Sequence, residues 1–195
     1  ARAIRAHADV ALLDLEQVAE GTRATGHSTL GLIRCLRAVL PAHAGEWVYY
    51  GATVQDVTDT WFALVMRDVL DVVDRDLRRC RDAALQLARR HRDTVMSGRT
   101  HGQPGLPITF GFKAAVWAAE LDRHVERIAQ ARPRLQVAQL GGALGTMEFW
   151  GPGALSLLDA FAVRLGLGVP ETPWITARDR VAEYATVLAL VTGTL

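Results

Sequence analysis

The sequence predicts an all-α chain built on two long helices. Small or apolar residues recur in alternating steps of four and three from Val73 to His91, and again from Phe110 to Ala138. That spacing places them on one face of an α-helix. No segment shows a convincing alternation of apolar and polar residues, which is the pattern of a strand. The long helices are therefore expected over about residues 54–92 and 107–140.

Each expected long helix measures about 50 Å, because an α-helix rises about 1.5 Å per residue. Helices of that length lie against one another or against partner helices, so we expect a long antiparallel helical bundle. Pro133 lies inside the second pattern and should bend that helix, since proline removes a backbone donor and crowds the preceding turn. Shorter helices are expected over about residues 4–20, 26–40, 153–166 and 177–195.

Composition narrows the functional classes. The 22 Lys and Arg residues nearly balance the 21 Asp and Glu residues. The net charge therefore predicts neither binding of nucleic acid nor binding to a membrane surface. No apolar run approaches the ~20 residues that span a bilayer. Cys35, Cys80 and the six histidines lack the spacing of a disulfide framework or a metal site. We expect a cytoplasmic protein without metal or cofactor, whose partners are small molecules or proteins.

Three loops at the ends of the helical patterns carry unusual chemistry. Residues 49–56 read YYGATVQD, residues 97–107 read SGRTHGQPGLP, and residues 140–146 read LGGALGT. Thr53 and Asp56 have the spacing of a capping box, and a helix start can also attract a carboxylate. GGALGT has no preceding strand, so it lacks the context of a nucleotide-binding loop.

The loop of residues 97–107 holds the residue types of an acid–base site. Arg99 can hold a carboxylate through two hydrogen bonds, Thr100 offers a hydroxyl, and Gln103 can both donate and accept. His101 can transfer a proton near neutral pH, and the surrounding glycines and prolines fix it in a tight loop. This context distinguishes His101 from histidines that lie within helical patterns.

Four ordered motifs resemble the fumarase/aspartase superfamily. They are GATVQDVTDT at 51–60, GRTHGQPGLPITFGFK at 98–113, GGALGT at 141–146 and RDRVAEYA at 178–185. Within it they are similar to the branch of adenylosuccinate lyase and 3-carboxy-cis,cis-muconate cycloisomerase. The resemblance implies a homotetramer around a central helical bundle, with each active site assembled from three subunits. It also implies removal of a group beta to a carboxylate, with release of fumarate, through a carbanion-like intermediate.

The resemblance also implies a division of the chain. Residues 1–50 would form the end of an N-terminal helical region, and residues 51–195 the first part of the central bundle. The rest of the bundle and the C-terminal domain would lie outside the sequence, and we expect a fragment of a longer polypeptide. The family's GSSxMPxKxNP loop, which carries the catalytic-base serine and a substrate lysine, does not occur in these 195 residues.

The resemblance assigns roles to individual residues of a dicarboxylate or succinyl site. His101 matches the general acid that protonates the departing amine, and Thr53 matches a threonine that holds a substrate carboxylate. The doubly charged intermediate requires donors aimed at it, for which Thr53, Thr100 and Gln103 are suited. The predicted catalytic residues are His101 and Thr100, and the predicted substrate-binding residues are Thr53, Gln55, Arg99, Gln103, His27 and Arg178.

Departures from the family pattern keep alternatives open. Val54 stands where the family usually has serine, and Gly26-His27-Ser28 where adenylosuccinate lyases commonly have Arg-His-Asp. Trp174 replaces their glutamine and is more like the cycloisomerases, many of which have tryptophan at the place of His101. The favoured function is adenylosuccinate-lyase-like cleavage of a C–N bond in a succinyl-type substrate. The alternatives are a 3-carboxy-cis,cis-muconate cycloisomerase and a non-catalytic helical assembly protein, as in the lens crystallins of this superfamily.

Overall fold

The computed structural model describes residues 2–27 and 29–194, in two compact units. The first unit combines the residues up to Ala63 with Val137–Ala177, and the second combines Leu64–Gln136 with the residues from Arg178 onward. Helix α5 (Val54–Arg90) contributes to both units. The division into regions at residue 50 stays a prediction. No helix in the described part of the chain combines the length and the apolar character that crossing a membrane requires.

The first 50 residues form short helices where the sequence predicts two longer ones. They are α1 (Arg2–His7), the 3-10 turn η1 (Val10–Leu12), α2 (Leu15–Thr25), α3 (Leu30–Ala38) and α4 (Ala42–Gly45). The expected continuous helix over residues 4–20 is wrong. Asp9 and Asp14 each accept hydrogen bonds of 2.9–3.1 Å from backbone N–H groups two or three residues ahead. Aspartates that bind nearby amides in this way start helices instead of continuing them.

The two predicted long helices are confirmed as α5 (Val54–Arg90) and α6 (Phe110–Leu135). The Thr109 hydroxyl starts α6 by accepting the Phe112 N–H at 3.1 Å. This helix ends two residues after Pro133, earlier than the expected residue 140. The bend expected at Pro133 stays a prediction.

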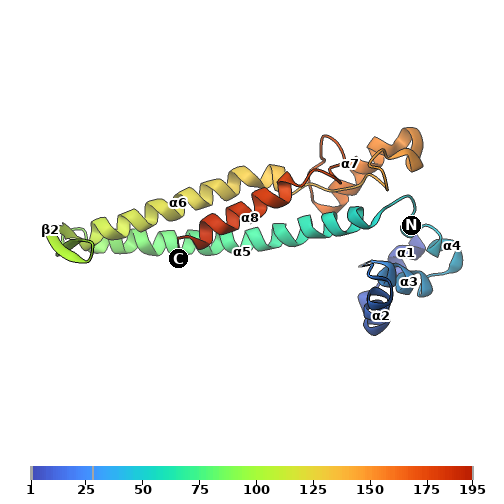
Figure 1. Ribbon diagram of the computed structural model, residues 1–195, viewed down its shortest axis with the longest axis horizontal. Helices are drawn as coiled ribbons and strands as arrows, with labels where there is room; N and C mark the ends of the chain where they lie inside the picture. Colours follow the sequence, from blue (N-terminus) through green and yellow to red (C-terminus); the bar gives the residue numbers. More distant parts are fainter. Residues whose placement is uncertain (1, 28, 195) are drawn as a thin grey trace. The chain divides into compact units, whose positions relative to one another are not determined.

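In the second unit α5 and α6 run antiparallel. Arg81 pairs with Asp122 at 3.1 Å, and Asp71 pairs with Arg132 at 2.6 Å. The two ion pairs lie ten residues apart on each helix. The pair that is nearer the N-terminus on α5 is nearer the C-terminus on α6, as in antiparallel helices. Helix α8 (Asp179–Thr192) runs beside α6 (Figure 1). The apolar side chains buried in this unit include Leu70, Leu77, Ala84, Ala114, Ala118, Ile128, Ala131 and Leu135.

A β-hairpin joins α5 to α6, where the sequence predicts a loop without strands. Strand β1 (Val95–Thr100) pairs antiparallel with β2 (Gln103–Thr109). His101 and Gly102 form the two-residue turn with φ of 48° and 76°, and positive φ at both positions is typical of a type I′ hairpin turn. The expectation of no strand is wrong here, because prolines and glycines obscure the alternation. Pro104 and Pro107 lack a backbone N–H. They are tolerated because the outer edge of each strand in this two-stranded ribbon pairs with no further strand.

The remaining part of the first unit packs on a small apolar core. The turn η2 (Glu148–Gly153) leads into α7 (Ala154–Leu165). The expected helix over residues 153–166 is confirmed here as α7, and the expected helix over residues 177–195 is confirmed in the second unit as α8 (Asp179–Thr192). The core cluster comprises Leu140, Met147, Ala154 and Leu158.

Candidate functional site

A buried carboxylate holds the first and third of the predicted loops together. Asp56 is 2% exposed. Its Oδ2 accepts the N–H groups of Thr53 and Gly142, both at 2.9 Å. Its Oδ1 accepts the N–H of Gly141 at 2.8 Å and the side-chain amide of Gln139 at 3.1 Å. Hydrogen bonds to an ionised acceptor are about twice as strong as neutral ones. One side chain therefore fixes the start of α5 against residues 141–142.

The bond from Thr53 to Asp56 is the aspartate half of the predicted capping box. Asp56 uses the N–H groups of Thr53, Gly141 and Gly142 at once. These three amides are occupied, so they cannot bind a substrate anion. The side-chain hydroxyl of Thr53 is then one side-chain donor that this loop can offer to a carboxylate.

Gln139 extends the network to a third segment. Thr60 Oγ1 donates to the Gln139 carbonyl oxygen at 2.8 Å and accepts the Gln139 N–H at 3.0 Å. The Gln139 Oε1 accepts the Trp174 N–H at 2.6 Å, and Trp174 Nε1 donates to the Ala138 carbonyl oxygen at 3.0 Å. Trp174, on which the likeness to cycloisomerases rests, is thus a buried link in the first unit.

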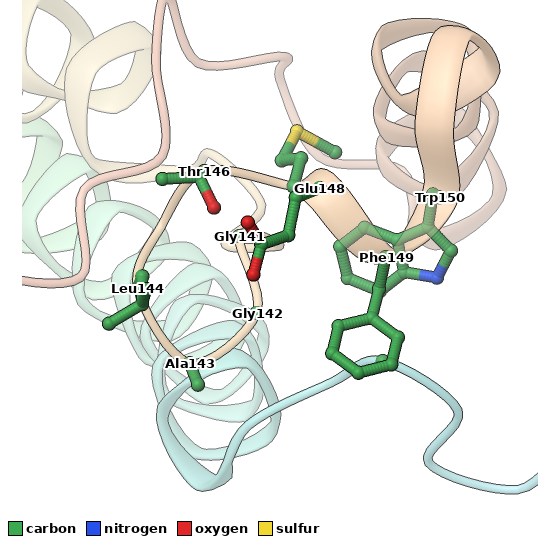
Figure 2. A pocket seen from close by; sticks show the side chains of 10 residues that line it. Gly141, Gly142, Ala143, Leu144, Thr146, Glu148, Phe149 and Trp150 are labelled. Atoms are coloured by element: carbon green, nitrogen blue, oxygen red, sulfur yellow. The ribbon is translucent and has the colours of Figure 1, made fainter.

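Gly51 and residues 141–144 and 146–150 line a small pocket (Figure 2). The Glu148 carboxylate and the Thr146 hydroxyl turn into this loop (Figure 2). Gly51 has a φ of 71°, and a Cβ there would lie 3.0 Å from the Trp150 ring. Only glycine therefore allows the first loop to lie this close. A carboxylate in the pocket repels anions, and the occupied glycine amides likewise argue against a phosphate cradle.

Tyr49 lies four residues before Thr53 and belongs to the same loop. Its side chain is half-buried, and its φ is 63°. Burial raises the pKa of Tyr49, a hydrogen bond with the Thr53 side chain lowers it, and the negative charge of Asp56 raises it again. The pKa stays above the usual value, so this phenol is protonated at neutral pH.

Four of the predicted site residues meet on the β-hairpin of the second unit. Thr100 and Gln103 are cross-strand partners, so their side chains share one face. Arg99 precedes Thr100 in the strand and points to the opposite face. His101 occupies the turn, in a left-handed conformation for which histidine is one of the enriched residues. All four side chains are exposed in the single chain, and an efficient acid–base site excludes water.

Two of the other predicted residues make hydrogen bonds within the first unit. The Gln55 side-chain amide donates to the Ile175 carbonyl oxygen at 3.1 Å. His27 Nδ1 accepts the Leu30 N–H at 3.1 Å, which satisfies a free amide at the start of α3. Arg178 is exposed and directly precedes α8. Their contacts with substrate stay predictions. Among residues 2–27 and 29–194, no group of His, Cys, Asp and Glu side chains is placed to hold a metal ion.

Sequence patterns identify the loops but miss the residues that connect them. Asp56 and Gln139 act on partners up to 86 residues away, and no local spacing encodes such contacts. The capping-box spacing was a partial signal for Asp56. Nothing in the sequence distinguishes Tyr49 from Tyr50, because the left-handed backbone of Tyr49 depends on how the loop folds.

Comparison with known proteins places the chain in a family. The sequence matches the family model described as Lyase over residues 2–195. The chain belongs to this lyase family. It is 40% identical to N-acetyl-S-(2-succino)cysteine lyase of Dickeya dadantii, over 100% of the chain and 43% of that protein. It is 38% identical to adenylosuccinate lyase of Methanocaldococcus jannaschii, over 100% of the chain and 42% of that protein.

A solved structure supports the same placement. The 3-carboxy-cis,cis-muconate lactonizing enzyme from Pseudomonas putida is similar with a TM-score of 0.95 and 39% identity, over 99% of this chain and 44% of that one. The resemblance to the fumarase/aspartase superfamily and the helical-bundle fold class are thereby confirmed. The chain spans less than half the length of these relatives.

Proposed function

We propose that the protein containing this chain is a lyase that eliminates a nitrogen or related leaving group from a succinyl-type substrate and releases fumarate. The observation that carries the proposal is the hairpin tip, where a histidine, a hydroxyl, an amide and a guanidinium lie within five residues, 99–103, of a lyase-family chain. Two relatives, the N-acetyl-S-(2-succino)cysteine lyase and the adenylosuccinate lyase, are lyases of succino compounds by name.

The proposed reaction uses these groups in sequence. A base removes the proton next to one carboxylate, and the electron pair spreads into that carboxylate as a doubly charged intermediate. The hydroxyls of Thr53 and Thr100 and the Gln103 amide donate to the developing charge, and Arg99 holds a carboxylate. The carbon–carbon double bond then forms as the bond to the leaving group breaks. His101 supplies the proton that the leaving group takes up.

The length of α5 supports a shared site in an oligomer. Thr53 directly precedes this helix and Thr100 follows it, and the 37 residues of α5 form about 55 Å of helix. The superfamily resemblance implies sites shared between subunits, and a substrate-sized site that combines a residue before α5 with one after it agrees with that implication. Trp61 and Trp117 are 62% and 40% exposed on their helices, and such apolar surface favours association. These features support the homotetramer implied by the superfamily.

A cycloisomerase acting on a carboxylated muconate is the second candidate. The similarity to the Pseudomonas putida lactonizing enzyme and the buried Trp174 favour it. His101 favours the lyase, because an amine leaving group requires a proton. The cycloisomerase reaction forms a ring by addition of a carboxylate and does not release an amine. Turnover of a carboxymuconate, together with inactivity on every succinyl substrate, would establish the cycloisomerase.

The test is His101→Asn in the full-length protein, assayed on two succinyl substrates whose leaving groups differ in basicity. The turnover number should fall by about 100-fold or more for the basic leaving group, the scale of losing a general acid. The loss should be smaller for the leaving group that needs no proton. His43→Asn, at another exposed histidine, is the matched control and should change neither rate. Equal losses on both substrates would assign His101 an orienting role, and no loss would remove it from the mechanism.

A further inference from the structure

An open groove of about 310 Å³ lies between the β-hairpin and the start of α6. Its lining consists of the side chains of Met96, Ser97, Arg99, Ile108, Phe112, Lys113, Val116 and Trp117. This volume is at the lower end of the range for small-molecule sites, about 300–1,000 Å³. All the lining residues belong to the second unit, so this unit forms the groove by itself.

Most of the lining is apolar, and two of its side chains are aromatic. Met96 and Ile108 are cross-strand partners in the hairpin, and both are half-buried. Phe112, Val116 and Trp117 lie on α6 and are 62%, 50% and 40% exposed. An apolar lining that includes aromatic rings favours a ligand that carries a ring of its own, because rings stack on each other or meet edge to face.

Two cations line the same groove. Within residues 2–27 and 29–194, neither Arg99 nor Lys113 forms an ion pair with a carboxylate. None of the described residues in the lining is acidic. Arg99 lies on the hairpin face opposite to that of Thr100 and Gln103. The groove therefore offers positive charge beside apolar surface, which complements an anion with an apolar body.

The ammonium group of Lys113, the only lysine in the sequence, is already held at the groove. Its Nζ lies over the Trp117 ring, 5.5 Å from the ring centroid. The Trp117 ring in turn meets Phe110 edge to face, with 6.2 Å between the centroids. A cation–π contact attracts the ammonium to the ring, so the lysine loses less conformational freedom when an anion binds.

We propose that this groove binds a small aromatic carboxylate. The ring of the ligand contacts Phe112 and Val116, and its carboxylate is held by Arg99 and Lys113. An arginine binds a carboxylate through two parallel hydrogen bonds, and a lysine adds a point charge. The ligand is a second molecule besides the succinyl substrate, and Arg99 is the residue that the groove shares with the proposed reaction. The inference therefore goes beyond the proposed function.

The first test is isothermal titration calorimetry of the full-length protein with 2-naphthoate and with 2-naphthamide, an uncharged analogue of the same shape. Naphthoate should bind with a Kd of about 1 mM or lower, the scale for an ordinary ligand of this size. Naphthamide should bind about tenfold more weakly, because it cannot form charge-assisted hydrogen bonds with the two cations. Equal affinities would overturn the proposal. Undetectable binding of naphthoate would do so as well, and it is the result expected if a second copy of the chain covers the groove.

Variants of the lining residues locate the ligand. Lys113→Met removes the charge and keeps a long side chain, so it should weaken naphthoate by about tenfold and change naphthamide by less than about twofold. Phe112→Leu should weaken both ligands by about threefold or more, since a ring contact is lost. Arg89→Gln is the matched control, because Arg89 is exposed in the last turn of α5 and lies outside the lining. Equal losses for Arg89→Gln and Lys113→Met would assign the affinity to net charge and overturn the site.

Thr53→Val separates the groove from the proposed catalytic site, because Thr53 belongs to the first unit. This variant should keep the naphthoate Kd within about twofold of wild type. A loss as large as that of Lys113→Met would place naphthoate in the catalytic site and overturn the proposal. If Lys113→Met fails to fold, Arg99→Met on the exposed hairpin carries the same prediction, and an unchanged naphthoate Kd would overturn it. Melting temperatures within about 2 °C of wild type identify the variants that retain the fold.

Discussion

Replacing Asp56 with asparagine should destabilise the first unit, because a single carboxylate satisfies four N–H donors there. Asparagine keeps the shape and has one acceptor oxygen instead of two. Its amide nitrogen must then face either the pair formed by Gly141 and Gln139 or the pair formed by Thr53 and Gly142. Each buried donor left without an acceptor costs about 1–3 kcal/mol, so two such donors lower the free energy of unfolding by about 2–6 kcal/mol.

The measurement is thermal unfolding of the full-length protein, followed by circular dichroism. One kcal/mol shifts the melting temperature of a domain of this size by about 2–4 °C, so Asp56→Asn should lower it by at least about 4 °C. Asp68→Asn is the matched control on the same helix, since Asp68 is 69% exposed and pairs with its neighbour Arg67 at 3.0 Å. Exposed pairs contribute about 0–1 kcal/mol. Melting temperatures for the two variants that agree within about 2 °C would refute the anchoring role of Asp56.

Two further predictions concern the second unit. Gly111→Ala should lower the free energy of unfolding by about 1–3 kcal/mol, because the added Cβ would lie 2.6 Å from the Ala88 carbonyl oxygen. Gly153→Ala is the control, since a Cβ there would have no atom within 4 Å. Equal denaturation midpoints for the two variants would contradict the prediction. Burial, and next the charge of Arg127, lower the pKa of His124 below 6.5. The unfolded chain then binds the proton more readily, so the stability that neutral His124 contributes is complete above pH 6.5 and decreases as the pH falls below it. The free energy of unfolding is measured by urea denaturation at about pH 8 and about pH 5.5, and it should fall more between these pH values for wild type than for His124→Asn. Equal falls for the two proteins would count against a role of His124.

The helical periodicity predicts α5 and α6 because a repeat of apolar residues is a local property of the chain. The same local rule fails where a single side chain intervenes. Asp9 and Asp14 interrupt the expected first helix by binding nearby amides, and the turn at His101 and Gly102 pairs two strands through backbone bonds that residue patterns do not reveal.

By itself, the sequence determined the helical class, the long helices, the hairpin residues 99–103 as a cluster, and the resemblance that the family match confirms. Only the tertiary structure decided what holds the first loop in place. Asp56 binds the amide of Gly142, 86 residues away, and the left-handed Tyr49 differs from Tyr50 through the fold of its loop. The reason is physical: periodicity records which face of a helix is buried, whereas a hydrogen bond forms only after distant segments have been brought within about 3 Å of each other.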